Sequence, residues 1–139
     1  MSVGVLLITH DDIGTSLVDS LQQMLGTLPL KVKVLPIRHE NEPITFCYHV
    51  EKLFLSLNEG HGVLVLTDLF GATPSNIACS LANNHRVRIV CGVNLPMLVK
   101  IMNYPSADLD TLANKALSGG CQGILDVNSV LNPAKVNSM

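Results

Sequence analysis

The sequence contains no tryptophan, and aromatic residues make up only 4% of its 139 residues. Leu, Val, Ile and Ala must therefore fill the interior. Charged residues are also scarce, at 14%, whereas hydrophobic residues reach 47%. This balance excludes an intrinsically disordered chain. A chain of 139 residues is long enough for one domain with its own core.

The sequence also lacks an excess of positive charge, with a formal net charge of −2 at pH 7. Nucleic-acid binding needs clustered Lys and Arg, so we expect no nucleic-acid partner. No apolar run approaches the roughly 20 residues that cross a bilayer. The apolar run at residues 3–8 is too short for the hydrophobic region of a signal peptide. We therefore expect a cytoplasmic protein without direct membrane insertion.

Several chemical motifs are missing as well. The four cysteines lie far apart, and scattered cysteines in a chain with a good core are usually reduced. Neither a P-loop nor a Gly-x-Gly-x-x-Gly motif occurs, and no serine lies in a Gly-x-Ser-x-Gly elbow. Four of the histidines also lack metal-ligand spacing: His39, His49, His61 and His85. We expect no metal site, no cofactor and no hydrolase serine.

What the sequence does contain is an alternation of short apolar runs and helical patterns. The runs are rich in Val, Ile and Leu and lie at 3–8, 31–36, 63–66 and 87–91, as is typical of strands buried on both faces. Helical spacing indicates helices at 13–25 (before Gly26), 46–57 (before Gly60), from Thr73-Pro74, at 95–102, and at 109–117 (ended by Gly119-Gly120).

This alternation predicts an α/β fold: a three-layer, open, mostly parallel sheet with helices on both faces and right-handed crossovers. We expect the strand order 2-1-3-4. Residues 123–127 are a candidate last strand. The domain should span residues 1–127, followed by a loose polar tail over 128–139.

In an open α/β sheet the functional site lies beyond the carboxyl ends of the strands. His10 ends the first predicted strand, and Asp68 follows the third. In the order 2-1-3-4 these strands are neighbours, so His10 and Asp68 should face each other across a crevice. A carboxylate that accepts the Nδ1 proton leaves the Nε2 lone pair free to attack and stabilises the positive ring that results.

The loop after Asp68 adds an anion site. Backbone N–H groups around Gly71 and Ala72 can bind phosphate, and Thr73 can donate its hydroxyl. Asn94, beyond the fourth strand, is a supporting candidate. The set suits phosphoryl transfer to and from His10. Simpler interpretations stay open: a loop histidine, an aspartate in a turn, and helix caps at Thr73 and Asn94.

At these positions the chain resembles the mannose-family enzyme IIA domain of the bacterial phosphoenolpyruvate-dependent sugar phosphotransferase system. The resemblance covers about residues 1–125 and three motifs in the family's order: the apolar strand ending in Thr9-His10, residues 66–76, and residues 92–98. It implies that His10 accepts a phosphoryl group from phospho-HPr and passes it to a histidine of enzyme IIB.

The resemblance has further implications for site and assembly. Asp68 corresponds to the family's acidic partner, and Thr73 to the serine of its Gly-Gly-Ser-Pro loop. Family members are typically homodimers in which a C-terminal strand, here 123–127, packs on the other subunit's sheet. No IIB domain follows in this sequence. We therefore expect a separate enzyme IIB, with association to membrane IIC and IID components.

The sequence departs from the family pattern at two places. Gly71-Ala72-Thr73-Pro74 keeps a hydroxyl but restricts the backbone at Ala72. Asp11 and Asp12 follow His10, where the family often has glycine. Their charge should repel a phosphoryl group unless they point away or cap the first helix.

Two other functions fit parts of the pattern. A receiver-like regulatory domain would be phosphorylated on Asp68, with Asp11 and Asp12 holding Mg²⁺. Against it, no fifth strand ending in Lys is apparent, and residues 91–93 offer no Ser or Thr. A non-enzymatic sensor would carry the same phosphohistidine at His10 and use it to regulate a partner.

Overall fold

The computed structural model describes residues 2–39, 43–132 and 134. In chain order, the elements are β1 (Gly4–His10), α1 (Ile13–Leu25), β2 (Val32–Ile37), α2 (Pro43–Leu57), β3 (Val63–Thr67), α3 (Thr73–Cys79), β4 (Val87–Cys91), α4 (Leu95–Met102), α5 (Leu109–Gln122) and α6 (Val127–Leu131). Among the described residues, no helix has the length and hydrophobicity that a membrane span requires.

The four strands form one parallel sheet in the order β2-β1-β3-β4, which confirms the predicted fold class and strand order. The inner strands β1 and β3 are buried along their length except at His10. They lie under helices on both faces, so they need continuous apolar sequence. The edge strands β2 and β4 are only partly buried, so the expectation of two-sided burial was wrong for them.

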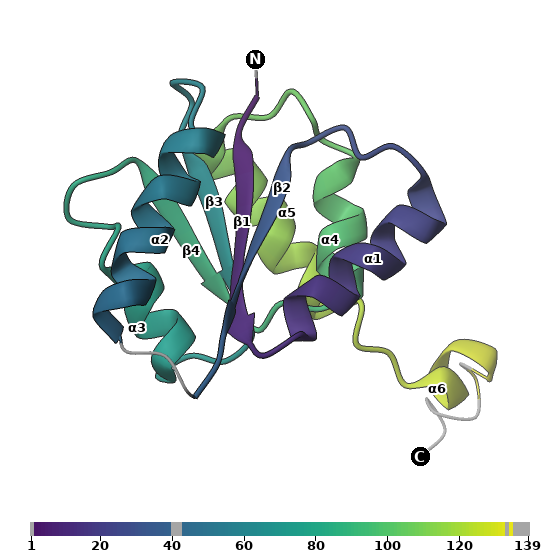
Figure 1. Cartoon of the computed structure of the whole chain (residues 1–139). Coiled ribbons are helices and arrows are strands. Elements are labelled where there is room, and N and C mark those ends of the chain that lie inside the picture. The colour runs from purple at the N-terminus through teal and green to yellow at the C-terminus, as the bar shows by residue number, and fades with distance from the viewer. Residues whose placement is uncertain (1, 40–42, 133, 135–139) are drawn as a thin grey trace.

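Helices cover both faces of the sheet (Figure 1), with α1, α4 and α5 on one side and α2 and α3 on the other. Side chains of a strand alternate between the two cores. In β1, Val5 and Leu7 contribute to the core under α1, α4 and α5, whereas Leu6 and Ile8 contribute to the core under α2 and α3. These two cores hold β1 and β3 in place and so fix the position of the carboxyl edge.

The buried face of α1 differs from the expected one. Helical spacing indicates a face made of Ile13, Leu17, Leu21, Met24 and Leu25. Leu21 is buried as expected, and Leu17 is half-buried against the same core. Ile13, Met24 and Leu25 are exposed, whereas Gly14 and Val18 are buried. Thr9 Oγ1 accepts a hydrogen bond from the Gly14 N–H at 2.9 Å, and a Cβ at Gly14 would lie 2.8 Å from that oxygen. Glycine therefore lets α1 begin directly against β1. This contact places the side of the helix that carries Gly14 against the sheet.

Gly119 and Gly120 lie inside α5 and do not end it, contrary to the sequence expectation. A Cβ at Gly119 would collide with the Lys100 side chain of α4, and one at Gly120 would lie 2.9 Å from Met97 Cε. The two glycines let α5 approach α4 closely. Here helix packing outweighs the usual tendency of glycine to end a helix.

The chain after α5 leaves the body of the molecule. Residues 124–126 have no regular structure, and no residue of α6 is buried. Figure 1 shows α6 apart from the sheet and its helices. The candidate strand at 123–127 is therefore not formed within a single chain, and its exchange between two subunits stays a prediction. Of the expected tail, residues 133 and 135–139 lie outside the described residues.

Candidate functional site

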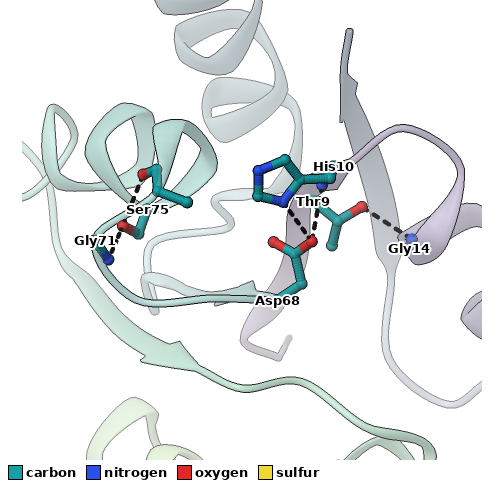
Figure 2. Close-up of polar contacts among 7 residues, drawn as sticks. Thr9, His10, Gly14, Asp68, Gly71 and Ser75 are labelled. Atoms are coloured by element: carbon teal, nitrogen blue, oxygen red, sulfur yellow. Dashed lines mark hydrogen bonds and ion pairs between the residues drawn. The ribbon is translucent and has the colours of Figure 1, made fainter.

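His10 and Asp68 lie together at the carboxyl edge of the sheet. His10 is the last residue of β1, and Asp68 directly follows β3, the parallel neighbour of β1. Asp68 Oδ2 accepts a hydrogen bond from the His10 backbone N–H at 3.0 Å and lies 2.8 Å from His10 Nδ1. Figure 2 shows both contacts converging on the same carboxylate. One oxygen atom thus holds both the main chain and the ring of His10.

The second ring nitrogen of His10 faces away from this contact. Because the Asp68 carboxylate is an acceptor, the Nδ1 atom carries the proton and Nε2 carries the lone pair. Within the described part of the chain, Nε2 makes no hydrogen bond. The His10 side chain is 35% exposed, while that of Asp68 is 12% exposed. The arrangement presents an oriented imidazole beside a shielded carboxylate.

Two opposing effects act on the pKa of Asp68. Burial raises the pKa, because it disfavours the charged form, but hydrogen bonds from the ring and the backbone N–H of His10 outweigh this. The net result is a pKa below the ordinary value of 3.8. Its second oxygen, Oδ1, is buried and has no hydrogen-bond partner among the described residues. Asp68 is therefore ionised at neutral pH and can stabilise a positively charged imidazole.

The loop after Asp68 is held by an internal pair of hydrogen bonds. The Gly71 N–H donates to Ser75 Oγ at 2.9 Å, and that hydroxyl donates to the Ala72 carbonyl at 3.0 Å (Figure 2). Gly71 has φ +83°, in the region that favours glycine. Its N–H is thus already occupied within the loop. Sequence reasoning missed Ser75, although a hydroxyl in the first turn of a helix is a known loop-stabilising signal.

The other loop positions differ in detail from the expected helix start. Ala72 is the N-cap of α3, so Thr73 is the first helical residue and not the cap. The backbone at Ala72, with φ −91° and ψ 174°, is extended, so alanine fits there without strain. Neither Ala72 nor Thr73 donates its N–H to another described residue. Thr73 is exposed, so its hydroxyl is accessible.

The side-chain contacts of Asn94 are those of a helix cap. Its Oδ1 accepts a hydrogen bond from the Met97 N–H at 2.9 Å, and its Nδ2 donates to the Gly120 carbonyl at 3.2 Å. Asn94 thereby caps α4 and links it to α5. Among the described residues, no hydrogen bond joins it to His10 or Asp68.

The two aspartates after His10 behave differently. Asp12 Oδ1 pairs with Arg38 Nη2 at 2.7 Å and makes no side-chain capping bond to α1. Asp11 adopts φ +44°, in the left-handed region, and its N–H donates to the Ile37 carbonyl at 3.0 Å. The Arg38 partner of Asp12 is not predictable from the sequence, because α1 and β2 separate the two residues along the chain.

The same contacts bear on the receiver-like alternative. That function needs Asp11, Asp12 and Asp68 to share a cation. In the described ranges, no three His, Cys, Asp or Glu side chains are placed to hold a metal ion. Asp12 is paired with Arg38 and Asp68 with His10. The geometry therefore favours chemistry at the histidine.

Comparison with known proteins gives a consistent picture. The family model described as "EIIA-man: PTS system fructose IIA component" matches residues 4–117. The PTS system fructose-specific EIIA component of Bacillus subtilis (strain 168) is 30% identical over 103 residues, which are 73% of this chain and 69% of that relative.

Solved structures of phosphotransferase-system IIA proteins share the fold, as two examples show. The mannose/sorbose-specific IIA subunit of the phosphotransferase system from Enterococcus faecalis superposes with a TM-score of 0.81 at 23% identity, over 91% of this chain and 95% of that chain. The PTS IIA protein associated with the fucose utilization operon of Streptococcus pneumoniae gives a TM-score of 0.78 at 24% identity, over 95% and 100%.

Proposed function

Because this chain belongs to the EIIA-man family of phosphotransferase-system IIA components, we propose that it carries the phosphoryl group of sugar uptake on His10. The observation that carries this assignment is the 2.8 Å contact between His10 Nδ1 and Asp68 Oδ2, which leaves Nε2 as the reactive atom. Phospho-HPr is the proposed donor, and a histidine of a separate enzyme IIB is the proposed acceptor.

In the proposed reaction, Nε2 of His10 attacks the phosphorus atom of the donor phosphohistidine. The new bond forms between Nε2 and phosphorus, while the bond to the donor imidazole breaks and that imidazole leaves with the electron pair. The His10 ring becomes positively charged, with its proton still on Nδ1 against the Asp68 carboxylate. Transfer to enzyme IIB repeats the step with the acceptor imidazole as nucleophile.

The loop after Asp68 is the proposed binding site for the phosphoryl oxygens. The Ala72 and Thr73 N–H groups and the Thr73 hydroxyl are the donors available for this role. Gly71 would act indirectly, because its N–H holds Ser75 and so fixes the shape of the loop. Hydrogen bonds of this kind stabilise the charge on a phosphoryl group in transit.

Exposed apolar residues beside His10 support protein partners over a sugar substrate. Leu69 and Phe70, directly after Asp68, are 62% and 81% exposed, and Ile13 at the start of α1 is 47% exposed. Large apolar side chains in water are characteristic of protein interfaces. Such a surface suits a donor and an acceptor that are themselves proteins.

The proposed assembly is a cytoplasmic homodimer that exchanges residues 123–127 and meets the membrane IIC and IID components through enzyme IIB. Two observations support the exchange. Ile124 and Leu125 are 79% and 64% exposed on a segment that lies apart from the body. The edge strand β4 pairs only with β3 among the described strands, so its other edge is open to an added strand.

The function is tested by incubating the protein with phosphoenolpyruvate, enzyme I and HPr and measuring its intact mass. Wild type should gain one acid-labile phosphoryl group, and His10→Ala should gain none. His85→Ala is the matched control, because His85 also pairs with a carboxylate, Glu51, but through Nε2. It should be phosphorylated like wild type.

Besides a wild type that gains no phosphoryl group, two results would contradict the assignment. One is a His10→Ala variant that still gains an acid-labile group. The other is a Mg²⁺-dependent, hydroxylamine-sensitive group gained from a small phosphodonor, which would place the phosphoryl group on Asp68.

A further inference from the structure

An ion pair lies beside His10 on the β2 side of β1. Arg38 Nη2 is 2.7 Å from Asp12 Oδ1. Arg38 directly follows Ile37, which is the register partner of His10 in the sheet. Asp12 lies two residues after His10, and the intervening Asp11 donates its N–H to the Ile37 carbonyl. The pair is therefore at the carboxyl edge, across β1 from the carboxylate that holds the His10 ring.

The charge at this edge is otherwise negative. Asp11, Asp12 and Asp68 all lie there, whereas Arg38 is the only Lys or Arg in the described segments that follow the strands, residues 11–14, 38–39, 68–73 and 92–94. A phosphoryl group carries up to two negative charges of its own. An unpaired carboxylate at this edge would therefore oppose its approach to His10.

We propose that Arg38 is a positioning residue for phosphoryl transfer: it neutralises Asp12 and so lets the negatively charged phosphoryl group reach His10. The inference rests on the proposed function of His10. Arg38 acts through Asp12 and need not touch the phosphoryl group. Arginine suits this role because its guanidinium stays charged at all physiological pH values and matches the geometry of a carboxylate.

The molecule contains a matched control for this pair. Arg88 Nη1 lies 2.8 Å from Asp110 Oδ1, and these side chains are 42% and 75% exposed, against 47% and 64% for Arg38 and Asp12. Arg88 is the second residue of β4, and Asp110 lies in the first turn of α5, so this pair is at the amino edge of the sheet. Both pairs should contribute similarly little to stability, but only one is near His10.

The test measures the rate of phosphoryl transfer from phospho-HPr to the full-length protein. Arg38→Gln exposes the Asp12 charge and should lower kcat/KM severalfold, because one uncompensated exposed charge acts only weakly through water. Asp12→Asn should not slow transfer, although it breaks the same pair. The double variant should return to the wild-type rate, and Arg38→Lys should retain most of it. Arg88→Gln should transfer at the wild-type rate.

Ionic strength gives an independent readout. Because salt screens exposed charges, the deficit of Arg38→Gln should shrink between low and high salt. A merely structural role for Arg38 would leave the deficit independent of salt and would slow Asp12→Asn as well. If Arg38→Gln fails to fold, the transfer rate of Asp12→Asn relative to wild type still tests the inference. A slower rate for Asp12→Asn overturns it.

Failure of the inference differs from failure of the proposed function. If wild type is phosphorylated on His10 but Arg38→Gln is as fast as wild type, or the double variant is as slow as Arg38→Gln, only the inference is overturned. If wild type and His10→Ala both gain no phosphoryl group, both are overturned.

Discussion

At the scale of single residues, the site depends on one oxygen atom. Asp68 Oδ2 bonds to the backbone N–H and to Nδ1 of His10, so it controls both the position of the strand end and the orientation of the ring. The hydrogen bonds from His10 also lower the pKa of Asp68 below 3.8 despite its burial. In the proposed reaction, the same carboxylate therefore orients the His10 nucleophile and stabilises its positive product.

Asp68→Asn should slow phosphoryl transfer by at least about 10-fold, the lower end of the loss found when the carboxylate partner of a metal-bound histidine is changed. The amide can still accept the backbone hydrogen bond, but it cannot stabilise a positive ring with a full charge. Stopped-flow or quenched-flow phosphorylation by phospho-HPr measures the rate. Unchanged kinetics would reduce Asp68 to a structural role.

The same variant should alter the pH dependence of stability. Because the pKa of Asp68 is lower in the folded protein than its ordinary 3.8, its ionised form stabilises the fold at pH values above that. This stabilisation is lost as the pH falls through the folded-state value. Urea unfolding of wild type and Asp68→Asn should give a difference in free energy at pH 7 that diminishes below pH 3.8. A difference that stays constant with pH would argue against the charge effect.

The residue scale also shows what sequence can predict of a site. The pairing of His10 with Asp68 was predictable, because strand ends can be located from apolar runs and parallel neighbours end at one edge. The Arg38 partner of Asp12 was not, because it depends on how the segment after β2 meets the start of α1. The Ser75 contact inside the loop likewise depends on local geometry that composition does not reveal.

At the scale of elements, hydrophobic periodicity locates helices and strands but does not settle which side of a helix is buried or where a helix ends. Close contacts between elements settle both. The strand positions and their order follow from apolar runs that must be buried. The inward side of α1 depends on Gly14 meeting Thr9, and the length of α5 depends on Gly119 meeting Lys100. A helical wheel cannot supply either contact, because each one joins residues of different elements.

Gly119→Ala should therefore destabilise the fold by about 1–3 kcal/mol, the usual range for overpacking a well-packed interface. In an isolated helix the same change would stabilise by about 1 kcal/mol, so the sign of the effect distinguishes packing from helix propensity. The free energy of unfolding in urea measures it. Asn114→Ala, at an exposed position of α5, is the control and should change stability by only a few tenths of a kcal/mol. A stabilised Gly119→Ala would show that α4 and α5 can separate at low cost.

At the scale of the whole molecule, the described residues form a folded body and a C-terminal segment that lies apart from it. The sheet and its helices bury two apolar cores. Beyond Gly123, the chain instead exposes large apolar residues: Ile124, Leu125, Val127, Val130 and Leu131. A segment of this composition gains most when it packs on another surface.

Leu125→Asp should convert the proposed homodimer to a monomer, because a charge within 123–127 would have to be buried in the exchanged strand. Light scattering coupled to size exclusion measures the mass. Val130→Asp in α6 is the control, since it lies outside the proposed strand and should leave the dimer intact. Monomeric wild-type protein at micromolar concentration would contradict the exchange.

The contact between Asp68 and His10 has a consequence for the order in which the proposed carrier binds its two partners. With Nδ1 engaged by Asp68, Nε2 is the ring nitrogen left for both steps of the proposed reaction. Donor and acceptor must then approach from the same direction, and two proteins cannot occupy that space at once. Loading and unloading therefore alternate, and the two partners compete for the carrier. The fraction of molecules carrying a phosphoryl group at any moment accordingly measures the balance between supply from one partner and demand from the other.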